Sequence, residues 1–133
     1  MKIKSTLAIF LVLLTNVNAQ DLKMISHIDS NEMIKNHEAI IIDVRELEET
    51  TFGAVRNAYY IPLSLMTTNK SSFDLKISKL PKDKQIIVYC RTGRRSSIVG
   101  HELQKRGFRV LNMGSFDSWK SAGFETEEKR KEL

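Results

Sequence analysis

The residues most able to do chemistry gather around Cys90, the only cysteine among the 133 residues of the chain. Cys90 is followed directly by the run Arg-Thr-Gly-Arg-Arg-Ser, which places three arginines within five residues of the thiol. The thiolate is the nucleophilic form of cysteine, and nearby cations favour it over the neutral thiol. The pattern therefore predicts a reactive cysteine in an anion-binding loop rather than an inert thiol in apolar surroundings.

The segments on either side of Cys90 predict how this loop is held. Residues 86–89 form a short apolar, mostly β-branched run that is typical of a buried parallel strand. A segment that opens at Ser96 then carries apolar residues at helical spacing. Gly93 allows the connecting loop to turn its backbone N–H groups inward, and the helix adds unpaired N–H groups and the positive end of its dipole. We expect an anion cradle with the Cys90 sulfur at its rim.

Asp43 marks a second position of interest because it ends the apolar run over residues 39–44. Such a run is typical of a central parallel strand, and its last residues reach the carboxyl edge of the sheet, where open α/β sheets bind ligands. Arg45 follows at once. The sequence therefore predicts that Asp43 lies at the same edge as the cysteine loop.

Histidine does not contribute to the predicted site. His27, His37 and His101 lie far apart and show no ligand spacing, so we expect no metal, and no motif indicates a cofactor. No histidine is an evident base for Cys90, so its activation must come from the loop itself.

Composition indicates one soluble globular domain with a real core, since 41% of the residues are hydrophobic and 28% are charged. The formal net charge is +5. Nucleic-acid binding would require basic residues spread over one face, but the densest basic cluster is Arg91, Arg94 and Arg95 in the predicted anion loop. We therefore expect no nucleic-acid partner.

The N-terminus has the pattern of a cleavable export signal. Two lysines among the first four residues precede an apolar run over residues 7–14 and a small-residue site that ends at Ala19. The run is far shorter than the roughly 20 residues of a spanning helix, so we expect no stable membrane anchor. The prediction is a signal peptide at 1–19 and a periplasmic or secreted domain at 20–133. Disulfides are common outside the cytoplasm, but a single cysteine cannot form one within its own chain, so we expect Cys90 to be free, reactive or paired with a partner.

Strands and helices are expected to alternate along the mature chain. The expected strands cover residues 23–25, 39–44, 57–61, 86–89 and 109–111. The expected helices cover residues 29–36 with Asp29 as N-cap, one turn within 47–51, 73–80, 96–107 and a last turn or two within 114–123, while residues 67–72 are expected to form a polar loop. This alternation predicts an α/β fold, an open parallel sheet of about five strands with helices on both faces.

Taken together, the motifs of the mature chain resemble the rhodanese domain, and the export signal makes the chain most similar to the small single-domain periplasmic rhodaneses. The motifs are Asp-Val-Arg-Glu at 43–46, the stretch 53–62, the run 80–84 into the cysteine strand, the loop from Cys90, and Asn112-Met113-Gly114 with Trp119. Two departures are visible. The stretch 53–58 lacks a histidine that the family often has, and Ser115 replaces the second glycine of a frequent Gly-Gly pair. Neither touches the loop.

The resemblance implies transfer of a sulfane sulfur through a persulfide on Cys90. The donor would be a small anion such as thiosulfate, and the acceptor a thiol, cyanide or a protein. The implied active loop consists of Cys90, Arg91, Thr92, Gly93, Arg94 and Arg95. Of these residues, Arg91 and Arg94 would orient the donor and Arg95 would close the loop. By the same resemblance, Asp43 and Arg45 would support the site without taking part in the chemistry.

Two other functions remain open at this stage. Tyrosine phosphatases and rhodanese-like phosphatases place five residues between cysteine and arginine, whereas four separate Cys90 from Arg95 here. The smaller cradle suits a single sulfur atom better than a phosphate, and it disfavours a phosphatase or an arsenate reductase. The second alternative is a non-catalytic rhodanese module that only binds partners, and the intact cysteine and arginines argue against it.

Overall fold

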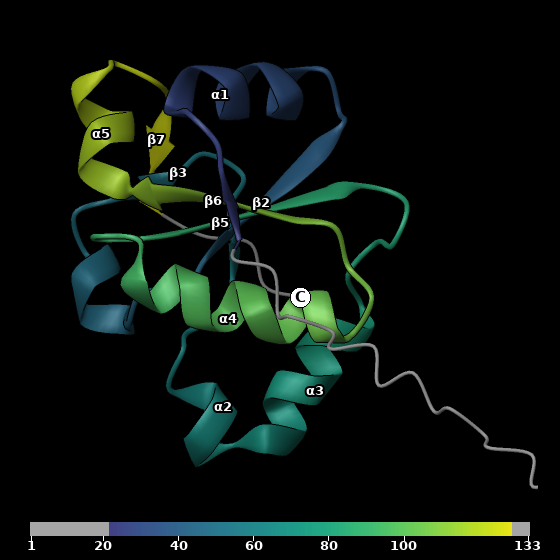
Figure 1. Ribbon diagram of the computed structural model, residues 1–133. Coiled ribbons are helices and arrows are strands. Elements are labelled where there is room, and N and C mark those ends of the chain that lie inside the picture. The colour runs from purple at the N-terminus through teal and green to yellow at the C-terminus, as the bar shows by residue number, and fades with distance from the viewer. Residues whose placement is uncertain (1–21, 129–133) are drawn as a thin grey trace, which may run out of the picture.

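A five-stranded parallel sheet forms the centre of the molecule (Figure 1). The structure is a computed structural model and describes residues 22–128. The strand order is β1-β6-β5-β2-β4. The strands are β1 (Lys23–Met24), β2 (Ala39–Asp43), β4 (Tyr59–Tyr60), β5 (Gln85–Cys90) and β6 (Val110–Ser115). The predicted α/β class with an open parallel sheet is confirmed. The predicted export signal lies outside the described residues.

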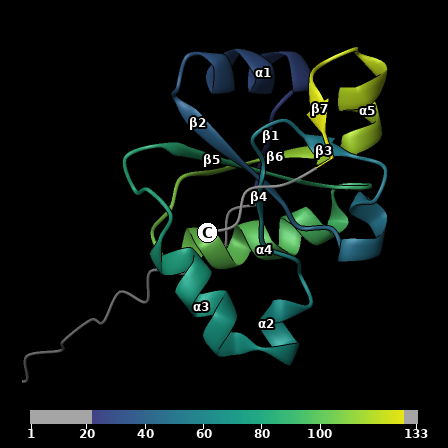
Figure 2. The same cartoon turned by 180° about the vertical axis from the view of Figure 1, so that it is seen from behind.

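Helices cover both faces of this sheet, as the sequence predicts (Figures 1 and 2). On one face lie α1 (His27–Lys35) and α5 (Phe116–Ser121), and on the other α2 (Leu65–Thr68), α3 (Lys70–Ser78) and α4 (Arg94–Lys105). The central strand β5 serves both layers, because Ile87 and Tyr89 pack with α5 while Ile86 and Val88 pack with α4. Burial on both faces explains the unbroken apolar run before Cys90.

A second, two-stranded sheet was not predicted from the sequence. In it, β3 (Ala54–Val55) pairs antiparallel with β7 (Thr126–Glu127). Strands of two residues are too short to show an alternating pattern, so the sequence carries no periodic signal for them. The pairing ties the chain just after Gly53 to the C-terminal part of the described domain.

Several helix boundaries differ from the predicted ones for local reasons. The first helix begins at His27, and its N-cap is Ser26, whose Oγ accepts a hydrogen bond from the Asp29 N–H at 3.0 Å. The prediction of Asp29 as the cap was wrong because a serine hydroxyl already occupies that role three residues earlier. The predicted turn near residue 47 is a 3-10 helix, η1 (Leu47–Thr50).

The predicted polar loop over residues 67–72 is also largely helical. Only Asn69 separates α2 from α3, and its side chain caps α3 by accepting from the Ser72 N–H at 3.1 Å. Serine and threonine have weak helix propensity, so the segment looked like a loop, but the asparagine cap starts a new helix there. No helix within residues 22–128 is long and apolar enough to cross a membrane.

Candidate active site

The cysteine loop connects the end of β5 to the start of α4, close to the irregular register of β6 at Gly114. Gly93 is the N-cap of α4 and has φ +98, a left-handed conformation that favours glycine. A Cβ on Gly93 would lie 3.3 Å from the Cα of Gly114 on β6, so the loop packs directly against that strand. Because α4 begins at Arg94, two residues before the predicted start at Ser96, Arg94 and Arg95 lie in its first turn.

The Cys90 sulfur is surrounded by hydrogen-bond donors. The Gly93 N–H donates to Sγ at 3.0 Å, and the Ser96 Oγ lies 3.4 Å from it. Burial raises the pKa of the Cys90 thiol, but hydrogen bonds from the Ser96 hydroxyl and from the N–H groups of Ser96, Gly93 and Thr92 outweigh this effect, so the pKa lies below its ordinary value. The direction agrees with the sequence-based expectation. The site therefore favours a thiolate.

Asn112 bonds both Gly93 in the loop and Ser96 directly after it, a role that sequence reasoning missed. Its Oδ1 accepts from the Ser96 hydroxyl at 2.8 Å, and its Nδ2 donates to the Gly93 carbonyl at 3.0 Å. Oδ1 also accepts the Gly114 N–H at 3.0 Å. The single hydroxyl proton of Ser96 can therefore turn to a Cys90 thiolate while Asn112 stays hydrogen-bonded. The only sequence signal for this role was a serine near the start of a predicted helix, because a serine hydroxyl there often seeks a hydrogen-bond partner.

The three arginines of the loop lie in different surroundings. Arg95 forms a two-oxygen ion pair with Glu49 of η1, in which Nη2 lies 2.6 Å from Oε1. The hydrogen bonds from Arg95 lower the pKa of Glu49 to about 2. Arg91 and Arg94 are exposed and form no ion pair with another residue of the described range. Two cations of the loop therefore remain available to an anion, and Glu49 is a partner that the sequence motifs did not identify.

Asp43 and Arg45 form a buried pair beside the loop. Arg45 Nη2 lies 2.7 Å from Asp43 Oδ2, which also accepts the Tyr89 hydroxyl at 2.7 Å. Burial lowers the pKa of Arg45, but the hydrogen bonds and charge of Asp43 outweigh this and raise it. Arg45 also donates to the backbone carbonyls of Gly53 at 2.8 Å and Glu49 at 3.3 Å. The pair thus fixes the segment that carries Glu49, the partner of the loop.

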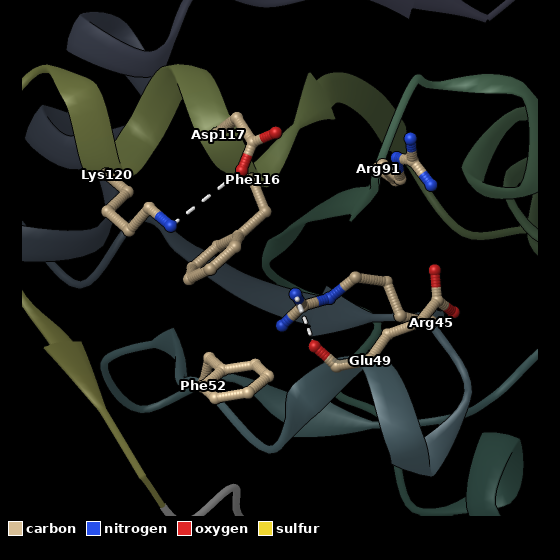
Figure 3. Close-up of a pocket in the computed structure, with 7 residues that line it drawn as sticks. All are labelled: Arg45, Glu49, Phe52, Arg91, Phe116, Asp117 and Lys120. Carbon is tan, nitrogen blue, oxygen red and sulfur yellow. Dashed lines mark hydrogen bonds and ion pairs between the residues drawn. The ribbon is translucent and has the colours of Figure 1, made fainter.

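A cavity of about 260 Å³ opens beside the loop (Figure 3). Figure 3 shows the Arg45 guanidinium group between the rings of Phe52 and Phe116, with Arg91 on the opposite side. The lining residues are Arg45, Glu49, Phe52, Arg91, Phe116, Asp117 and Lys120. They come from η1 and the chain around it, from the loop and from α5. Within residues 22–128, no three His, Cys, Asp or Glu side chains are grouped to hold a metal ion.

Residues 27–122 match the Rhodanese-like domain family, a span that includes the whole sheet except β1 and both layers of helices. The chain belongs to this family. The resemblance inferred from the sequence motifs is therefore confirmed. The region of rhodanese similarity contains the cysteine loop, its partner Glu49 and all residues of the cavity.

Two curated relatives match this rhodanese domain over most of their own length. The chain is 28% identical over 101 residues to the thiosulfate sulfurtransferase GlpE of Coxiella burnetii, which covers 74% of this chain and 88% of the relative. It is 33% identical over 101 residues to the putative sulfurtransferase YtwF of Bacillus subtilis, which covers 74% and 91%. Among solved structures, a rhodanese-related protein from Thermoplasma volcanium superposes with a TM-score of 0.66 at 28% identity, covering 80% of this chain and 99% of that one.

Proposed function

We propose that this protein is a sulfurtransferase that carries a sulfane sulfur as a persulfide on Cys90. The observation that carries the proposal is the environment of the Cys90 sulfur, which receives the Gly93 N–H, lies beside the Ser96 hydroxyl and has a lowered pKa. Relatives named as sulfurtransferases support this activity in general. We propose thiosulfate, or a small anion like it, as the donor.

In the first half-reaction, the Cys90 thiolate attacks the outer sulfur of thiosulfate. The sulfur–sulfur bond of thiosulfate breaks, and sulfite leaves with the electron pair. The exposed Arg91 and Arg94 attract the donor, which carries two negative charges. The N–H groups that surround the thiolate then stabilise the persulfide anion, which divides the transfer into two easier steps.

In the second half-reaction, an acceptor takes the outer sulfur from the persulfide. A thiolate or cyanide attacks that sulfur, the bond to Cys90 breaks, and the Cys90 thiolate leaves with the electron pair. A thiol, cyanide or the thiol of a protein would serve as the acceptor. Since the two substrates react in turn with one enzyme group, ping-pong kinetics are expected.

The structure of the loop bears on the two alternative functions. The tight turn at Gly93 brings a backbone N–H to 3.0 Å from the sulfur, and Arg95 is engaged by Glu49. Arg95 is therefore not free to bind an oxyanion in the cradle, as the closing arginine of a phosphatase or an arsenate reductase must be. A binding module needs no cysteine with a lowered pKa, whereas the pKa of Cys90 is lowered. The engaged Arg95 and the lowered pKa both favour sulfur transfer.

Mass spectrometry of the purified protein tests the proposal directly. After incubation with thiosulfate, the protein should gain the mass of one sulfur atom and lose it again to cyanide or a thiol. The Cys90→Ser variant should remain folded and gain nothing. Reduced wild-type protein that takes up no sulfur from thiosulfate or another sulfane donor would contradict the proposal and favour the binding module.

A further inference from the structure

We propose that the cavity beside the active loop binds the carboxylate end of a small organic thiol, and that such a thiol is the preferred sulfur acceptor. This inference rests on the proposed sulfurtransferase function and names the acceptor class. It is drawn from the charges, the aromatic rings and the volume of the cavity.

Arg45 presents an unused donor in the cavity. The residue is only 4% exposed and lines the cavity. Four of its five N–H groups bond Asp43 and the carbonyls of Gly53 and Glu49. Nη1 itself donates to the Glu49 carbonyl at 3.3 Å, and its second hydrogen has no acceptor within residues 22–128. A ligand oxygen in the cavity that accepts this hydrogen would form a charge-assisted hydrogen bond, which is stronger than a bond between neutral groups.

The other charges of the cavity also favour a carboxylate. Glu49 lines the cavity but is neutralised by its ion pair with Arg95. Asp117 and Lys120 lie 4.0 Å apart and offset each other. Arg45 is offset by Asp43, so Arg91 is left as the unpaired charge of the cavity lining. A ligand with one negative charge is therefore preferred over a neutral or cationic one.

Two phenylalanines provide an apolar surface next to these charges. Phe52 is 89% exposed at the rim, whereas Phe116 is 5% exposed and lies under the Arg45 guanidinium group, 4.2 Å from its ring centroid (Figure 3). An exposed ring beside a cavity gains free energy when a hydrocarbon chain covers it. The volume of about 260 Å³ equals roughly eight or nine waters at ~30 Å³ each, which suits a small organic molecule.

The position of the cavity gives the bound carboxylate a function. Arg91 lies on its wall and directly follows Cys90, so a short ligand that spans from Arg45 towards Arg91 directs its other end to the loop. A thiolate at that end attacks the outer sulfur of the Cys90 persulfide. A new sulfur–sulfur bond forms on the acceptor, the bond to Cys90 breaks, and the Cys90 thiolate leaves with the electron pair.

A matched series of acceptors tests the preference. Persulfide-loaded protein is offered 3-mercaptopropionate, 2-mercaptoethanol or cysteamine at equal thiolate concentrations. Each rate is divided by the rate at which the same thiolate attacks a small disulfide, which removes the differences in intrinsic nucleophilicity and leaves the charge of the far end. The expected kcat/KM for the carboxylate is about tenfold above that of the other two, as expected for a charge-assisted hydrogen bond. Equal values for the three thiols would overturn the inference.

Variants locate the preference in the cavity. Lys120→Gln should reduce the ratio of carboxylate to neutral acceptor about two- to fivefold, because it leaves the charge of Asp117 without its offset. Phe52→Ala should instead slow both acceptors by a similar factor, because the ring covers the hydrocarbon chain that they share. Lys70→Gln and Leu75→Ala are matched controls, because Lys70 is an exposed lysine paired with Asp74, Leu75 is 58% exposed, and both lie on α3 across the sheet. The inference fails if Lys70→Gln changes the ratio as much as Lys120→Gln does, or if Leu75→Ala slows the acceptors as much as Phe52→Ala does.

A binding experiment separates this inference from the proposed function. The unloaded protein is titrated with 3-(methylthio)propionate or 2-(methylthio)ethanol, which cannot accept sulfur, and the backbone amide NMR signals are followed. Only the carboxylate should shift the signals of Phe52, Arg91 and Lys120. If it does so while Cys90 never gains sulfur, the sulfurtransferase proposal fails and the carboxylate site stands. If sulfur transfers but the carboxylate shifts none of these signals, the inference fails.

Discussion

Cys90 lies where burial and hydrogen bonding act on its pKa in opposite directions, and hydrogen bonding prevails. The main donors are groups of the loop and the first turn of α4. The sequence predicts the direction of this shift from inward-turned N–H groups of the loop, a helix N-terminus and the arginines. The structure shows the N–H groups and adds the Ser96 hydroxyl, which lowers the pKa more than any other group. Motif reading finds a contiguous loop, yet it does not reveal which of its atoms face the sulfur.

The first prediction concerns the Ser96 hydroxyl. Ser96→Ala should raise the pKa of Cys90 because one hydrogen bond to the thiolate is lost, while Asn112 keeps the Gly114 N–H. The pH titration of thiolate ultraviolet absorbance measures this shift. Ser97→Ala is the matched control, since no hydrogen bond joins Ser97 to Cys90 within the described residues. Identical titration midpoints in wild type and Ser96→Ala would contradict the prediction.

A second prediction at the residue scale concerns Arg91 and Arg94. Both are exposed and unpaired with acids of the described range, so their attraction for a dianionic donor is screened by salt. Raising the ionic strength should raise the KM for thiosulfate, and Arg91→Ala or Arg94→Ala should raise it about two- to fivefold at low salt. Steady-state kinetics measure both effects. Arg109→Ala, at the opposite end of β6, is the control. An unchanged KM for thiosulfate would show that Arg91 and Arg94 do not take part in binding the donor.

At the scale of elements, the presence of a helix or strand was easier to predict than the residues at which it begins and ends. The strands over residues 39–44 and 86–89 could be predicted from their apolar runs, which arise because both faces of each strand are buried. Helix starts depend instead on single N-cap residues. Ser26 and Asn69 cap with their side chains, whereas Gly93 caps with a left-handed backbone.

The contact between η1 and the loop gives the third prediction. The pKa of Glu49 is about 2 in the folded protein, against an ordinary value of 4.5. The Arg95–Glu49 pair therefore contributes stability that is fully present above pH 4.5 and is lost as the pH falls towards 2. Glu49→Gln should lower the free energy of unfolding by about 1 kcal/mol at pH 7, since both side chains are partly exposed.

Urea unfolding at several pH values measures this difference. The gap between wild type and Glu49→Gln should shrink between pH 4.5 and pH 2, where the carboxylate of the wild type also becomes neutral. Glu48→Gln is the control because Glu48 is an exposed neighbour that does not pair with Arg95. A gap that stays constant over this range would show that the pair adds nothing through its charges.

At the scale of the whole molecule, the parallel sheet assembles what the sequence separates. The carboxyl ends of β2 and β5 meet at one edge, which brings Asp43 and Arg45 beside the loop that follows Cys90. Lys120 of α5 and Phe52 after η1 reach the same cavity from distant parts of the chain. Only the contiguous loop and the Asp-Val-Arg run could be predicted from the sequence, since no local pattern links the other residues to the site.

The last prediction concerns the N-terminal segment and the compartment of the protein. The first described strand begins at Lys23, so cleavage between Ala19 and Gln20 would remove no part of the described domain. The cleavage pattern leads us to expect that the exported protein begins at Gln20, and that it keeps its sulfur-transfer activity. N-terminal sequencing of the protein from the extracytoplasmic fraction tests this. Ala19→Arg should block processing, because the cleavage site requires a small residue. Wild-type protein that stays unprocessed in the cytoplasm would contradict the prediction.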